Sequence, residues 1–200
     1  MVHLILHGAV RERITYAFSP HASTVRFFGR GAIIGVSDIF LDEPQPSVVE
    51  CLHETWTLAY PLDRIRMLAE GEAGLMRNLA QALATQLKAN DRVYSLCRKS
   101  SAQRVASLLI ELFEINGEDS RTWPDSNGDW HSCPVVVGPS QVDIADALML
   151  SMASVENVLR GLRRIDILAT EYRQFVFLDM QRLKEVATGD LTIDTTPKKK

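Results

Sequence analysis

Four polar side chains share the outward side of the segment 151–164, whose apolar spacing favours a helix: Asn157, Arg160, Arg163 and Arg164. An asparagine amide can pair with the edge of adenine in the major groove. Guanidinium groups bind backbone phosphates, which position a protein on DNA. These residue types indicate contact with double-stranded DNA. The alternative is a solvated helix end, because cations also favour helix C-termini.

Two short helices are predicted to position these side chains, over 140–148 and 151–163. Ser140 precedes Asp143 by three residues and resembles a capping box, and Ser151 is a candidate N-cap. Apolar residues at helical spacing predict the buried faces: Val142, Ile144, Ala145 and Leu148 in the first helix, and Val155, Val158, Leu159 and Leu162 in the second. The candidate DNA-binding residues are Ser140, Gln141, Ser151, Met152, Ala153, Ser154, Asn157, Arg160, Arg163 and Arg164.

The flanking segments predict a winged helix-turn-helix over 99–188, followed by a polar tail over 189–200. Ser100 or Ser101 can cap a helix that stops at Gly117, and a polar loop over 118–129 leads to the strand "WHSCPVVV". "ILATEYRQFVFLD" predicts two strands around a turn, a candidate β-wing, and Asp179 can cap a last helix.

The first 68 residues predict short antiparallel strands separated by turns. After Pro61 the spacing becomes helical, with a break near Gly71 and Gly74. The fold class is therefore α+β, with a long helix over 69–98 between the two parts.

One apolar row follows this long helix at alternating spacings of four and three residues: Leu75, Leu79, Ala82, Gln86, Ala89 and Val93. The helix is longer than a small sheet needs to cover itself, which favours a dimer seam shared by two copies. The alternative is a helix that lies on its own sheet.

Composition excludes several classes of protein. The net charge is −3, and no apolar run has the length of a membrane span. Three separated cysteines exclude a disulfide framework and favour a reducing cytoplasm. We expect no metal, no cofactor and no enzymatic site, since His3 and His7 lack a third ligand. Cys97 is a candidate redox switch or, by default, a structural cysteine.

The chain from Met1 to about Ala187 resembles the CRP/FNR superfamily of bacterial transcription regulators. The segments that carry the resemblance, in the family's order, are "LILHGAV", "FFGRGAIIG", "SSAQRVASLLIEL", "SQVDIADALMLSMASVENVLRGL" and "FVFLDMQRL". It implies a cyclic-nucleotide-binding-type β-roll, a dimerisation helix and a winged helix-turn-helix. It also implies a cytoplasmic homodimer on a palindromic operator, with RNA polymerase as a candidate partner. Relative to the family, this chain starts in mid-roll, so the β-roll is expected to lack its first strands.

The sequence departs from the family in two places. In the stretch matching the cyclic-nucleotide cassette, Gly35 and Ser47 remain, but Val36 and Pro46 replace a glutamate and an arginine. Without that arginine a buried phosphate lacks its charge partner, so we expect a signal other than cyclic AMP or cyclic GMP. Met149 replaces a glycine common in the joint, and the base-contacting positions differ, so operator preference cannot be transferred.

Charge leaves a second hypothesis open. The segment from Lys99 to Glu185 contains nine basic and thirteen acidic residues, a net charge of −4, whereas DNA binding needs local positive charge. Arg173 and the tail 198–200 are further basic candidates. The alternative function is a module of the same fold that binds proteins and has lost DNA recognition.

Overall fold

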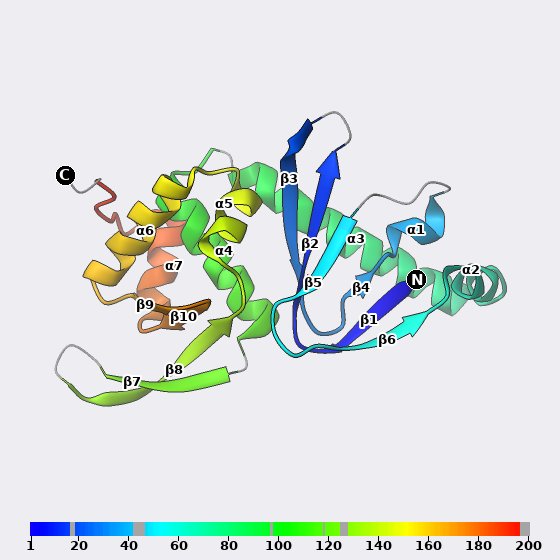
Figure 1. Cartoon of the computed structure of the whole chain (residues 1–200), viewed down its shortest axis with the longest axis horizontal. Coiled ribbons are helices and arrows are strands. Elements are labelled where there is room, and N and C mark those ends of the chain that lie inside the picture. Colours follow the sequence, from blue (N-terminus) through cyan, green and yellow to red (C-terminus); the bar gives the residue numbers. More distant parts are fainter. Residues whose placement is uncertain (17–18, 42–46, 97, 118, 125–127, 197–200) are drawn as a thin grey trace. The chain divides into compact units, whose positions relative to one another are not determined.

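The computed structural model describes residues 1–16, 19–41, 47–96, 98–117, 119–124 and 128–196, in two compact units, Met1–Ser95 and Leu96–Lys200. Figure 1 shows antiparallel sheets and helices in both, which confirms the predicted α+β class.

The N-terminal unit contains two three-stranded antiparallel sheets (Figure 1). One has the order β4-β1-β6 and the other the order β3-β2-β5. The strands are β1 (Val2–His7), β2 (Val10–Tyr16), β3 (Ser19–Phe28), β4 (Ile33–Ile34), β5 (Ser47–Cys51) and β6 (Trp56–Tyr60). The predicted short antiparallel strands are thus confirmed for this unit.

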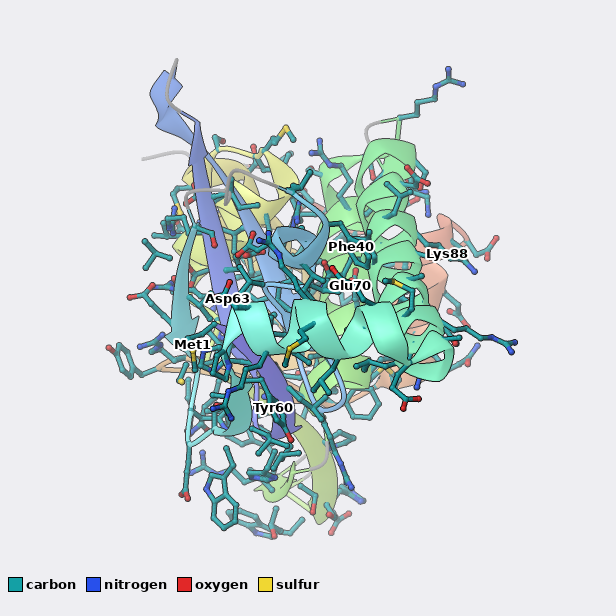
Figure 2. All side chains as sticks on the ribbon, turned by 90° about the vertical axis from the view of Figure 1, so that its right-hand side faces the viewer. Met1, Phe40, Tyr60, Asp63, Glu70 and Lys88 are labelled. Atoms are coloured by element: carbon teal, nitrogen blue, oxygen red, sulfur yellow. The ribbon has the colours of Figure 1, made fainter. Side chains whose placement is uncertain are left out.

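Three helices complete the N-terminal unit: α1 (Ser37–Phe40), α2 (Leu62–Gly71) and α3 (Ala73–Leu96). The predicted helical region therefore divides at Gly71, as its glycines indicate. Figure 2 shows this end of the unit, with α2 across the view and Asp63 and Glu70 on it. An apolar cluster joins β1 to these helices and contains Val2, Val36, Ile39, Ile65, Ala69 and Leu79.

The C-terminal unit has a four-stranded antiparallel sheet with the order β7-β8-β10-β9. Its elements are α4 (Ser101–Asn116), β7 (Asp119–Pro124), β8 (Trp130–Val137), α5 (Gln141–Leu148), α6 (Met152–Arg164), β9 (Leu168–Glu171), β10 (Gln174–Phe177) and α7 (Met180–Thr188). Ser100 caps α4 in a capping box with Gln103, and Asp179 caps α7. This is the predicted order of helix, helix pair and β-wing.

One element of this unit was not predicted. The segment expected to be a polar loop contains β7, which pairs with β8 from Asp119↔Val135 to Pro124↔Trp130. Its residues give a mixed signal, because Thr122 and Trp123 favour strands whereas Asp119 and Pro124 disfavour them, and the pairing with β8 decides for a strand.

Candidate nucleic-acid interface

The start of α5 is held by the capping box that the sequence indicates. Ser140 Oγ accepts a hydrogen bond from the Asp143 backbone N–H at 3.2 Å, and the Asp143 carboxylate accepts from the Ser140 backbone N–H at 2.8 Å. The Asp143 side chain is fully buried. Buried carboxylates are costly unless they are hydrogen-bonded, so this pair fixes where α5 begins.

The joint between the helices depends on Met149. This residue has φ 51° and ψ 44°, the left-handed region that favours glycine. Its side chain is 65% exposed, so the backbone turns without burying it. Ser151 then caps α6 by accepting from the Ser154 N–H at 3.1 Å. The helix pair therefore forms although a methionine replaces the family's glycine.

The facing surfaces of α5 and α6 are apolar and buried. Ile144, Ala145 and Leu148 are buried as predicted, and so are the four predicted residues of α6. Val142 was assigned to this face wrongly and is 49% exposed. It lies two positions before Ile144, which places it on nearly the opposite side of a helix, and Asp143 is buried next to it instead.

The predicted contact residues lie at the surface of α6 and at the helix starts. Met152, Ala153, Arg163 and Arg164 are exposed, as is Ser151, whereas Ser154, Asn157, Arg160, Ser140 and Gln141 are half-buried. The outward side of α6 thus brings together the two polar types expected of a DNA-binding helix, an amide and several guanidinium groups.

Two of the three arginines on α6 have carboxylate partners. Arg160 donates to Glu156 Oε1 at 3.0 Å and to Asn157 Oδ1 at 3.0 Å. Arg164 donates to Asp194 Oδ2 at 2.7 Å. Hydrogen bonds from Thr196, and then from Arg164, lower the pKa of Asp194 to about 2.

Arg163 differs from its neighbours. It donates to the hydroxyl of Thr170 at 2.7 Å and has no carboxylate partner within the described part of the chain. Its charge is therefore the one on α6 most available to an anion. Thr170 lies on β9, seven residues away, and no local sequence signal connects the two.

The tail after α7 is not merely polar. Ile193 is 8% exposed, and a Cβ on Gly161 would lie 2.7 Å from the Asp194 carbonyl oxygen. Glycine at 161 therefore lets the segment 193–194 approach α6 closely. The predicted basic tail 198–200 lies outside the described residues.

The wing is formed by β9 and β10, paired from Glu171↔Gln174 to Leu168↔Phe177. Tyr172, between the two strands, is 88% exposed. Arg173, a predicted basic candidate, donates to the Gly138 carbonyl at 2.8 Å. Arg173 therefore stabilises the segment between β8 and α5. Tyr172 is a candidate for DNA contact that the sequence did not indicate.

The predicted dimer seam on α3 packs partly against its own unit. Leu79 is 2% exposed within the N-terminal core, Leu75 and Ala82 pack against that core, and Gln86 donates to the Ile33 carbonyl at 2.8 Å. Ala89 is half-buried, and the side chain of Val93 lies outside the described part. Leu79 thus has almost no surface to offer a second copy, and dimerisation itself stays a prediction.

The described residues contain no group of three or more His, Cys, Asp or Glu side chains arranged for a metal ion. The His3 ring nitrogen lies 3.3 Å from the Thr57 hydroxyl, and the His7 ring lies 6.4 Å from the ring of Trp56.

Cys51 is exposed, Cys133 is buried, and Cys97 lies outside the described residues. No helix in the described part combines the length and apolarity needed to span a bilayer.

Residues 103–186 match the family described as the Crp-like helix-turn-helix domain. This match covers less than half of the chain and lies within the C-terminal unit. The match runs from α4 into α7, so the Crp-like domain includes the capped helix pair and the wing.

Solved structures resemble most of the chain, although at low identity. The CRP/FNR-family transcriptional regulator TTHA1359 from Thermus thermophilus is 21% identical, with 94% of this chain and 87% of that chain covered and a TM-score of 0.70. FixK2 from Bradyrhizobium japonicum is 23% identical, with 92% and 86% covered and a TM-score of 0.69. No match was found among curated proteins. The chain therefore has the CRP/FNR fold, as the resemblance predicts, with a Crp-like helix-turn-helix domain at its C-terminal end.

Proposed function

We propose that this chain is a homodimeric transcription regulator that inserts α6 into the major groove of DNA. The observation that carries this proposal is the outward side of α6, where Asn157 and three arginines lie. Ser151 caps α6, and Ser140 caps the preceding helix α5. In helix-turn-helix proteins the second helix lies in the groove while the first crosses the backbone. The geometry of α5 and α6 supports this arrangement.

The proposed contacts divide by chemistry. The Asn157 amide, held by Arg160, faces a base edge, and Met152 and Ala153 offer apolar contact to a thymine methyl. The phosphates are bound by Arg160, Arg163 and Arg164, together with the hydroxyl of Tyr172 at the wing. Phosphate contacts supply affinity, whereas base contacts supply sequence preference.

We place the dimer seam on the exposed side of α3. Leu87 is 62% exposed, and Ala80 and Ala84 precede it at spacings of four and three residues. Small residues at this spacing let two helices approach closely, and an exposed leucine beside them adds apolar area. A two-fold dimer would then favour a near-palindromic operator with half-sites about one helical turn, ~34 Å, apart.

We also propose that the regulatory signal is not a cyclic nucleotide. Val36 lies at the position of the family's cassette glutamate and is 1% exposed in the apolar core. An aliphatic side chain in that environment cannot accept a hydrogen bond from a ribose hydroxyl. Contact with RNA polymerase remains an expectation of the resemblance.

Selection of bound sequences from a random DNA pool by the purified protein tests the proposed function. We expect enrichment of a near-palindrome. If no sequence is enriched, the Crp-like domain does not recognise an operator, and the net charge of −4 over residues 99–185 favours the protein-binding module instead.

The seam is tested separately by light scattering. We expect a dimer for the natural chain and a monomer for Leu87→Glu, because the new charges would meet at the seam. Thr85→Glu is the matched control, since Thr85 is exposed on the other flank of α3. A monomeric natural chain at micromolar concentration would contradict the dimer.

A further inference from the structure

The C-terminal unit contains a hollow of about 500 Å³ beside the end of α6. Its lining comes from β7 and β8, from β9, and from the end of the proposed DNA-binding helix. Binding sites for small organic molecules commonly have volumes of about 300–1,000 Å³ and mostly apolar walls with a few polar groups. The hollow therefore has the size of such a site.

The apolar part of the hollow lies on the sheet face away from the core of the unit. Side chains alternate along a strand, so Val136 faces the core while its neighbours on β8 face the other way. Cys133, Val135 and Val176 form a small buried cluster there, against which Ala169 and Leu178 pack. Burial raises the pKa of the Cys133 thiol, which therefore stays neutral and adds to this apolar surface.

Trp123 supplies an aromatic wall whose position is fixed. Its side chain packs against the same cluster, and its backbone lies opposite His131 in the β7–β8 ladder. The Arg121 guanidinium lies 6.0 Å from the ring centroid and is itself paired with Glu171 on β9. An aromatic ring held in this way offers a preorganised surface for a planar molecule.

The polar part of the hollow contains one cation without a carboxylate partner within the described part of the chain. Arg163 lines the hollow and donates to Thr170, which lines it as well. Asp166 and Asp179 are also part of the lining, and Asp179 caps α7 by accepting from the Arg182 N–H at 2.9 Å. A ligand with one negative charge can therefore pair with Arg163, whereas a second negative charge on the ligand would be repelled by these carboxylates.

We propose that this hollow binds a small aromatic monocarboxylate, with its ring beside Trp123 and its carboxylate on Arg163. Guanidinium and carboxylate groups form strong charge-assisted hydrogen bonds, so Arg163 selects the charge, and Trp123 selects the flat ring. The regulatory consequence rests on the proposed function: Arg163 is also a proposed phosphate contact, so ligand and DNA compete for it.

Tryptophan fluorescence tests the binding step without DNA. Trp56→Phe and Trp130→Phe remove the two exposed tryptophans and leave Trp123 as the reporter. We expect benzoate to change this signal saturably with a Kd of about 1 mM, as suits a ligand of this size. Acetate, which lacks the ring, and benzylamine, which carries the opposite charge, should change it far less. No saturable response to benzoate, or an equal response to benzylamine, overturns the proposal.

Two variants in that background locate the site. Arg163→Met should weaken benzoate binding about tenfold or more, because the charge-assisted hydrogen bond is lost. Ala169→Leu should abolish binding by filling the hollow, and circular dichroism would show whether it folds. Lys184→Met is the matched control, since it removes one positive charge from the exposed side of α7. Unchanged binding by Arg163→Met would refute the assignment of the carboxylate.

The regulatory consequence is tested by adding benzoate to the complex with DNA. We expect benzoate to weaken DNA binding by the natural chain, and to have little effect on Arg163→Met, which has already lost the shared contact. If fluorescence shows binding but no DNA is bound at all, the proposed function fails while the site stands. If DNA binds but the Trp123 signal does not respond, the site fails while the proposed function stands.

Discussion

Arg160 is expected to act twice in DNA recognition, through a phosphate and through Asn157. Its guanidinium donates to Asn157 Oδ1 at 3.0 Å, and its side chain is 23% exposed. A hydrogen bond contributes about 0.5–1.5 kcal/mol net, and partial exposure reduces this, so we expect a coupling of about 0.5–1 kcal/mol between the two residues.

The perturbation is a double-mutant cycle with Asn157→Ala and Arg160→Ala. Asn157→Ala should weaken the selected operator by about 1–3 kcal/mol and leave random DNA nearly unaffected. Arg160→Ala should weaken binding to both DNAs and reduce the salt slope by about one unit. Binding to the operator should be weakened further, by the coupling energy. The double variant should therefore lose less on the operator than the two single losses combined.

Fluorescence anisotropy at two salt concentrations measures these affinities. The control cycle pairs Asn157→Ala with Arg164→Ala, because Arg164 is bonded to Asp194 and not to Asn157. We expect the control cycle to be additive to within about 0.5 kcal/mol. If the Asn157–Arg160 cycle is equally additive on the operator, Arg160 does not orient Asn157.

Three further predictions follow from buried or paired side chains. Leu79→Ala should lower the free energy of unfolding of the N-terminal unit by about 2–5 kcal/mol in urea titrations, because its side chain is 2% exposed; a loss below about 1 kcal/mol would contradict its core position. Asp143→Ala should cost about 2–3 kcal/mol in thermal unfolding, since a helix cap and two 2.8 Å hydrogen bonds from Ser140 are lost; an unchanged Tm would refute the role of the cap. Asp194→Asn should free Arg164, strengthen binding to random DNA and raise the salt slope by up to about one unit. The pKa of Asp194 is lowered to about 2, so its carboxylate stays charged and paired with Arg164 until the pH falls toward 2. DNA binding measured from pH 5 to pH 8 should therefore show no pH dependence caused by this pair.

The sequence by itself determined where the helices of the C-terminal unit begin. Ser100, Ser140, Ser151 and Asp179 each accept a hydrogen bond from a backbone N–H three residues later, as their positions in the sequence indicate. Such caps depend on residues within one turn, and so does the apolar spacing of α6. The capped helix pair, the wing and the outward side of α6 could therefore be predicted locally.

Only the tertiary structure decided which surfaces and charges are free. The spacing of Leu79 within α3 is the same whether it faces a second copy or its own core, and burial in the N-terminal unit decides for the core. Likewise, α6 carries three arginines that the sequence does not distinguish. Arg164 is paired with Asp194, thirty residues away, while Arg163 donates to the Thr170 hydroxyl and has no carboxylate partner among the described residues. Partners so distant along the chain depend on how the segments fold together, and no local spacing records them.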